Sequence, residues 1–209
     1  AFALDVGALG GMYSQKIVLV GTEHGVGMRN AGALGAQAGQ LVVTADGRLE
    51  NSGTMQAATD TRIDARGGVA NAGTLSAGRE LGVTTPRDID NSRGALNARR
   101  IQANAQSLKN RGGAIEQTGT RDLALRTAHL SNRDGGRLGL AAPDAGRAPG
   151  NGGTSDIGVD DETAGTGDGR HLPGTTTGTG AAPLAQGRLT IAATLDNDGG
   201  RIMAGGAID

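Results

Sequence analysis

The sequence predicts an all-β chain that winds as a right-handed parallel β-helix, with three short strands in each coil of about 20 residues. An Asn followed closely by Gly recurs at spacings of 21, 20, 20, 19 and 22 residues. Short runs between these markers alternate apolar with polar residues, which is the period of a strand. The chain holds 39 glycines, one Phe, one Tyr and no Trp, so small and aliphatic side chains must fill the core, as stacked coils allow.

The repeating unit is clearest from Asn51 to Asn91, where two copies follow one another. In the first copy, Met55 with Ala57 and Thr61 with Ile63 form two pairs at period two, and Val69 stands alone before the next Asn, which predicts three strands separated by turns. Equivalent residues of successive coils should then lie above one another in ladders. The predicted ladders contain the aliphatic residues Leu34, Met55, Leu75, Leu96, Ile115, Leu138 and Ile202, and the asparagines Asn30, Asn51, Asn71, Asn91, Asn110, Asn132 and Asn197.

The recurring asparagine has two interpretations. Asn tolerates the left-handed backbone conformation and bonds to its own turn, so it is a good turn former. In a stack, equivalent amides can also bond to one another from coil to coil, as in the Asn ladders of cross-β structures. The regular spacing favours the ladder, and neither role supplies chemistry.

Composition divides the chain into four predicted segments. Residues 1–29 form an irregular coil or coils, residues 30–140 regular coils, residues 141–186 a long Gly-, Pro- and Thr-rich insertion from one corner, and residues 187–209 a resumed coil that stops partway. The insertion explains the spacing of 65 between Asn132 and Asn197, and it holds four of the five prolines. Such a segment buries too little apolar surface to order itself. We expect the whole to be a piece of a longer, monomeric rod.

Three runs predict the strands of the first segment: residues 4–6, 17–20 and 26–28. Gly21, Gly25 and Gly27 are expected at corners where φ is positive. Glu23 and His24 share one of these corners. They have the chemistry of an acid/base or metal pair, but no third ligand is near in the sequence, so a polar network at the corner is favoured.

No pattern predicts a catalytic, cofactor-binding or metal site. No serine has a His and a carboxylate at a recognisable spacing, and His129 and His171 stand alone. The acidic residues of the insertion lack the spacing of a calcium-binding loop, so a solvated acidic loop is favoured over a calcium site for Asp156, Asp160, Asp161, Glu162 and Asp168.

Charged residues alternate in sign at the outward positions, which favours a solvated sheet surface. Arg99 with Arg100, and Lys109 with Arg111, are candidates for a glycan sulfate site, although neither pair is dense. A net charge of −1 argues against nucleic acid or an anionic membrane as a partner. No run of 18 apolar residues occurs, so no membrane-spanning segment is predicted. Without cysteine there are no disulfides.

A family resemblance rests on the stretch GGMYSQKIVLVGTEHGVGMRNAG, within residues 9–32, and on the Asn-x-Gly units that follow it. These residues resemble the exported proteins of two-partner secretion systems, which include filamentous haemagglutinins, large haemolysins and contact-dependent growth inhibition toxins. In that family, the stretch resembles the passage from the secretion domain into the haemagglutinin-type repeats. Residues 1–29 would then be the end of the secretion domain.

The resemblance implies a protein that is secreted to the surface of a Gram-negative bacterium through a dedicated outer-membrane pore. It implies a shaft that displays a binding region to a receptor or glycan on host cells or other bacteria, as in an adhesin that acts in virulence. The alternative is the shaft of a growth inhibition or haemolysin-type toxin with a C-terminal effector. A remote alternative, a polysaccharide-degrading β-helix enzyme, is disfavoured because Glu116, Asp122 and Asp134 do not fall at matching coil positions.

Overall fold

The computed structural model describes residues 2–140, 189–191 and 194–203, and these residues form strands and turns without a helix. None of this part of the chain offers a helix of the length and apolarity that a membrane crossing needs. The strands are β1 (Phe2–Val6), β2 (Gly11–Ser14), β3 (Ile17–Gly21), β4 (Gly27–Asn30), β5 (Ala33–Ala36), β6 (Leu41–Ala45), β7 (Leu49–Asn51), β8 (Thr54–Ala57), β9 (Asp60–Ala65), β10 (Val69–Asn71), β11 (Thr74–Thr84), β12 (Asp88–Asp90), β13 (Ala95–Lys109), β14 (Ala114–Gln117), β15 (Leu123–Ser131), β16 (Arg137–Leu140), β17 (Leu189–Ile191), β18 (Thr194–Asp196) and β19 (Arg201–Met203).

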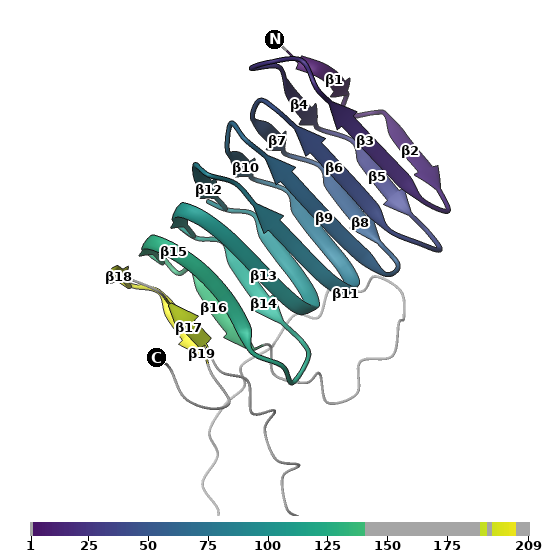
Figure 1. Ribbon diagram of the computed structural model, residues 1–209. Helices are drawn as coiled ribbons and strands as arrows, with labels where there is room; N and C mark the ends of the chain where they lie inside the picture. The colour runs from purple at the N-terminus through teal and green to yellow at the C-terminus, as the bar shows by residue number, and fades with distance from the viewer. Residues whose placement is uncertain (1, 141–188, 192–193, 204–209) are drawn as a thin grey trace, which may run out of the picture. The chain divides into compact units, whose positions relative to one another are not determined.

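The strands stack in parallel and form three faces, so the chain is the β-solenoid that the repeat predicts (Figure 1). The first face contains β2, β5, β8, the start of β11, the start of β13, β14, β16 and β19. The second contains β3, β6, β9, the end of β11, the middle of β13, the start of β15 and β17. The third contains β1, β4, β7, β10, β12, the ends of β13 and β15, and β18. Right-handed winding stays a prediction from the crossover rule.

The core lies between the three faces and is built of residues in strict register. On the first face, Leu34 pairs with Met55, Met55 with Leu75, and Leu75 with Leu96, and each of them is at most 1% exposed. Every second residue of a strand points inward, and the parallel register places it on the equivalent residue of the next coil. Each aliphatic layer is therefore covered by the layers on either side.

Two sequence predictions for the first segment are wrong. The first strand of this coil is β2, Gly11–Ser14, which the sequence does not predict, because its outward Tyr13 and exposed Met12 hide the alternation. Residues 4–6, predicted as that first strand, belong to β1 on the third face. Of the three corner glycines, only Gly25 has a positive φ, of 71°. Gly27 is required for space, because a Cβ there would lie 2.3 Å from the carbonyl oxygen of Arg48.

The predicted insertion, residues 141–186, lies outside the described residues. On either side of it the coils continue in register, since Leu123 pairs with Leu189, Leu130 with Leu195, and Leu138 with Ile202. The division of the chain into four segments stays a prediction.

Candidate functional site

The structure places seven asparagines in one column at the end of the third face, where each coil turns into the next. The side-chain amide of each of the first six donates from Nδ2 to the Oδ1 of the asparagine one coil further on, over distances of 2.7 to 2.8 Å. Six such bonds join Asn30, Asn51, Asn71, Asn91, Asn110, Asn132 and Asn197 into what we call the asparagine ladder. Its first six members are at most 2% exposed.

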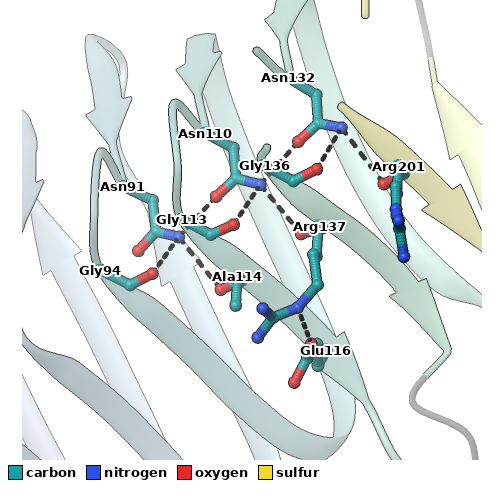
Figure 2. A network of polar contacts seen from close by, with 10 residues as sticks. All are labelled: Asn91, Gly94, Asn110, Gly113, Ala114, Glu116, Asn132, Gly136, Arg137 and Arg201. Carbon is teal, nitrogen blue, oxygen red and sulfur yellow. Dashed lines mark hydrogen bonds and ion pairs between the residues drawn. The ribbon is translucent and has the colours of Figure 1, made fainter. Parts of the chain in front are cut away.

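The second amide hydrogen of each ladder residue is also used. Asn110 Nδ2, for example, lies 3.2 Å from the carbonyl oxygen of Gly113 in its own turn and 2.9 Å from that of Arg137 in the next coil (Figure 2). The same arrangement holds at Asn91 and Asn132. A buried amide costs free energy unless its groups are bonded. The ladder meets that condition at every buried member after Asn30 and at the same time ties each turn to the following coil.

The ladder has a direction and a first member. All donors point toward the C-terminal coils, so the Oδ1 of Asn30 is the acceptor that begins the series. It is buried and has no donor among the described residues, because the residue opposite Asn30 in the preceding coil is Val6.

The glycine that follows each ladder asparagine sets the approach of the coils. A Cβ at Gly53 would lie 2.0 Å from the carbonyl oxygen of Gly32, and one at Gly73 would lie 2.0 Å from that of Gly53. Later turns are equally tight, at 2.1 to 2.2 Å for Gly94, Gly113, Gly136 and Gly200. The Asn-x-Gly signal therefore reports a close backbone contact between coils. Positive φ is not the reason at these glycines.

Longer turns absorb their extra residue by a left-handed conformation. Arg93 has a φ of 63° and Asp134 a φ of 52°, and these are the only positive values outside glycine in the described part of the chain. Both residues lie between a ladder asparagine and its glycine. The ladder asparagines themselves keep negative φ, so they do not act as left-handed turn formers.

Charged residues outside the ladder pair from coil to coil. Arg137 donates to Glu116 at 2.7 Å, Arg111 lies 3.0 Å from Asp134, and Arg79 pairs with Asp60. The Arg79 guanidinium lowers the pKa of the Asp60 carboxyl and the carboxylate raises the pKa of Arg79. Such exposed pairs contribute little to stability, because water and salt screen the charges.

Asp46 organises the corner that contains Glu23 and His24. It accepts a hydrogen bond from the backbone N–H of Gly25 at 3.0 Å, and Arg66 and His24 contact it at 3.0 and 2.8 Å. The Gly25 bond, with the Arg66 contact, holds the pKa of Asp46 below its usual value. The side chain of His24 is fully exposed, whereas that of Asp46 is 13% exposed. The corner is thus a polar network that links three coils.

One buried polar residue has no counterpart in the sequence pattern. Gln117 stands where the four preceding coils have alanine, and it is 0% exposed. Its Oε1 accepts from the backbone N–H of Ile101 at 2.8 Å, and its Nε2 donates to the carbonyl oxygens of Gly119 and Arg121. In the sequence, a glutamine at an inward position of the aliphatic alternation was the signal that could have identified this residue.

The structure separates the basic pairs that the sequence singled out. Arg99 and Arg100 lie where β13 passes from the first face to the second, whereas Lys109 ends β13 on the third face. His129 is exposed, and the acidic residues of the insertion lie outside the described residues, as does His171. Within the described ranges, no three His, Cys, Asp or Glu side chains gather as a metal site would require.

Chemically, the ladder makes and breaks no bond; it holds successive coils at one spacing and in one register. Parallel pairing, the aliphatic layers and the amide column all act between neighbouring coils. The arrangement is therefore a scaffold whose length grows with the number of repeats.

Comparison with known proteins finds one kind of relative. The chain is 51% identical to the protein named Toxin CdiA from Yersinia pestis over 75 residues, which are 36% of this chain and 2% of that protein. It is 54% identical to tRNA nuclease CdiA-2 of Burkholderia pseudomallei (strain 1026b) over 56 residues, 27% of this chain and 2% of the relative. It is 41% identical to tRNA nuclease CdiA of Escherichia coli (strain NC101) over 97 residues, 46% of this chain and 3% of the relative. The chain thus spans only 2 to 3% of these relatives. No family model and no solved structure matches it.

Proposed function

We propose that this chain, a relative of the CdiA growth inhibition proteins and like them of the two-partner secreted, filamentous haemagglutinin type, is a segment of the shaft that holds a functional region away from the bacterial surface. The observation that carries the proposal is the parallel register of successive coils, which resumes after the shifts between Phe2 and Leu4 and between Ala77 and Glu80. Each coil between the first and the last described one pairs on both edges, and one amide column and one aliphatic column run through the described repeats.

Extension by stacking is efficient and stiff. Each coil of about 20 residues adds roughly 4.8 Å, the spacing of hydrogen-bonded strands, so length is set by repeat number. Bending such a stack would open hydrogen bonds on one of its three faces. A shaft of this kind therefore holds what it carries at a set distance from its base.

The parent protein is secreted and lies at the surface of a Gram-negative bacterium. Its first partner is the outer-membrane pore of a two-partner system. Folding coil by coil outside the pore suits this structure, because every coil needs contacts only with its neighbours. The second partner is a receptor or glycan on a host cell or on another bacterium.

What the shaft displays has two candidates. In the first, it is the binding region of an adhesin. In the second, it is a toxic effector, and the printed names of the relatives, a toxin and two tRNA nucleases, favour this version. We do not assign the nuclease activity in those names to the coils themselves, because the matched residues are only 2 to 3% of those relatives.

The test is to shorten the shaft by whole and by half coils in the full-length parent protein. Deletion of residues 51–70 joins Glu50 to Asn71 in phase, so the remaining coils keep their register. We expect normal secretion and a shaft shorter by about 4.8 Å per coil removed, measured by electron microscopy on variants with several coils deleted. The matched control removes residues 51–60, which breaks the phase and should abolish folding and surface display.

Two readouts distinguish the candidates: adherence to host cells, and growth of neighbouring bacteria in contact with the producing strain. A spacer predicts a graded loss of either activity as coils are removed. If removal of residues 51–70 abolishes activity as completely as removal of residues 51–60, while the protein is still secreted and displayed, the coils do more than extend and the proposal fails.

A further inference from the structure

One corner of the coils departs from the repeat. In two successive coils, β11 and β13 run without interruption from the first face to the second. In the next coil, β14 ends at Gln117 and β15 begins at Leu123, so residues 118–122 leave the sheet as a loop. The buried side chain of Gln117 anchors this loop through the carbonyl oxygens of Gly119 and Arg121. The loop is therefore a fixed feature of the fold.

Beside this loop lies a hollow of about 580 Å³, which we call the arginine corner. Four arginines line it, from three successive coils: Arg79, Arg99, Arg100 and Arg121. The only carboxylate in its lining is Glu80. Four positive charges against Glu80, and against the Asp60 carboxylate that pairs with Arg79, leave the corner at about +2, on a chain whose overall charge is −1.

The charges of the arginine corner are not fully paired. Arg79 bonds to Asp60, and Arg100 lies 3.7 Å from Glu80, with its Nε buried and without an acceptor in the described part of the chain. Arg99 and Arg121 are exposed and form no ion pair with another described residue. The carboxylate next to Arg121 in the sequence, Asp122, is engaged in an interaction and is not free. Arg99 and Arg121 thus lack the coil-to-coil pairing seen at Arg137 and Arg66.

We propose that the arginine corner binds the phosphate monoester of a phosphorylated saccharide. Guanidinium groups present paired N–H donors that match the oxygens of phosphate, sulfate and carboxylate. A net charge of about +2 favours the ligand with the greatest charge, and a phosphate monoester carries about −1.5 to −2 at neutral pH, against −1 for a sulfate ester or a carboxylate. The hollow is larger than a phosphate group needs, and its lining includes Thr118 and Thr120, a residue type whose hydroxyl suits a sugar.

This inference does not rest on the proposed shaft function. A shaft without a ligand in this corner remains a shaft, and a ligand site on the corner requires only the local geometry. Failure of the binding experiment below would leave the coil-deletion experiment unaffected.

The binding test uses the full chain and isothermal titration calorimetry at 50 mM salt, with glucose 6-phosphate, inorganic phosphate, glucose 6-sulfate and glucose as probes. We expect glucose 6-phosphate to bind most tightly and glucose not to bind. The affinity should fall several-fold between pH 7.5 and pH 5, because the second proton of the monoester binds with a pKa of about 6. Raising the salt should weaken binding, since the partners are exposed.

The matched variants are Arg99→Gln with Arg121→Gln, and the control pair is Arg62→Gln with Arg126→Gln, which removes two exposed arginines from the outward side of the second face. The first pair should lower the affinity at least ~10-fold, and the control pair less than ~3-fold, because bidentate contacts are lost only in the first. The pair Arg99→Lys with Arg121→Lys keeps the charge but removes the paired N–H donors of the guanidinium groups. Its affinity should lie between those of the two glutamine pairs.

Three outcomes would overturn the proposal. Equal losses in the two glutamine pairs would show a general charge effect. Equal affinity for glucose 6-sulfate and glucose 6-phosphate at pH 7.5 would show that the corner does not select a phosphate monoester. Inorganic phosphate that binds as tightly as glucose 6-phosphate would show that the saccharide contributes nothing to binding. Thermal melting of each variant, expected to match the unchanged protein, confirms that the coils are intact.

Discussion

Val6 lies opposite Asn30 in the parallel register of β1 and β4, and this pairing leaves the Oδ1 of Asn30 as the undonated start of the asparagine ladder. Every later member receives a hydrogen bond from the coil before it. An apolar residue at this register position therefore ends the ladder.

Replacing Val6 by Asn should extend the ladder by one member. The new Nδ2 would stand where each ladder donor stands, one coil before its acceptor, and would satisfy Asn30. The gain is about 1 kcal/mol, which corresponds to a rise of roughly 2 to 4 °C in the melting temperature. The control Val6→Asp has the same shape without the donor and should lower it. A lower melting temperature for Val6→Asn than for Val6→Asp would contradict the assigned direction of the ladder.

Replacing Asn71 by Asp in the middle of the ladder should destabilise the coils by at least about 3 kcal/mol at pH 7. The change removes the donor to Asn91 Oδ1 and places a carboxylate at a site that is 1% exposed. Burial raises the pKa of the new carboxyl in the folded state, so the penalty is full above that raised pKa and declines as the pH falls toward the unfolded value.

Urea unfolding at several pH values measures this effect. The control is Asn104→Asp on the outward, exposed side of β13, which should change stability by less than about 0.5 kcal/mol. Equal stability of the Asn71 and Asn104 variants at pH 7 would mean that the ladder contributes nothing.

Replacing Gly73 by Ala should be strongly destabilising, whereas Gly82→Ala should be neutral or stabilise the protein by about 0.4 to 1 kcal/mol. A Cβ at Gly73 meets a carbonyl oxygen at 2.0 Å, but a Cβ at Gly82 meets nothing within 4 Å. Neither glycine has a positive φ, so space alone distinguishes them. Thermal melting of the two variants measures the difference, and similar melting temperatures would refute the close approach of the coils at the turn.

Replacing Asp46 by Asn should remove a pH-dependent part of the stability. The folded-state pKa of Asp46 is lowered, chiefly by the Gly25 N–H, so its contribution is present above the unfolded pKa of about 4 and is lost as the pH falls through the folded pKa. The free energy difference between wild type and Asp46→Asn should therefore be largest near neutral pH and shrink below pH 4. Asp64→Asn, on an exposed carboxylate nearby, serves as the control. A difference that does not change between pH 7 and pH 3 would contradict the role of this carboxylate.

Much of the fold follows from local order in the chain. The repeat of about 20 residues and the alternation within it are enough to identify inward residues such as Leu75 and Ile63. Both signals are local, since a strand shows its buried side within a few residues. The first coil is less predictable, because Met12 and Tyr13 do not show the alternation of a strand with one buried side.

The arrangement across coils could not be predicted in the same way. The direction of the amide bonds, the unsatisfied end at Asn30 and the space required by Gly73 depend on atoms about 20 residues apart in the sequence. The role of Gln117 and the gathering of Arg99 with Arg121 depend on how one corner opens into a loop.

The sequence by itself determined the coil, its period and the residues that face inward, because period-two alternation and a fixed repeat length are written along the chain. Only the tertiary structure decided which groups meet between coils, where the ladder starts and where the charges are left unpaired. The physical reason is that hydrogen bonds and close contacts act over a few ångströms in space, and the stacking of coils brings together residues that the sequence keeps a full turn apart.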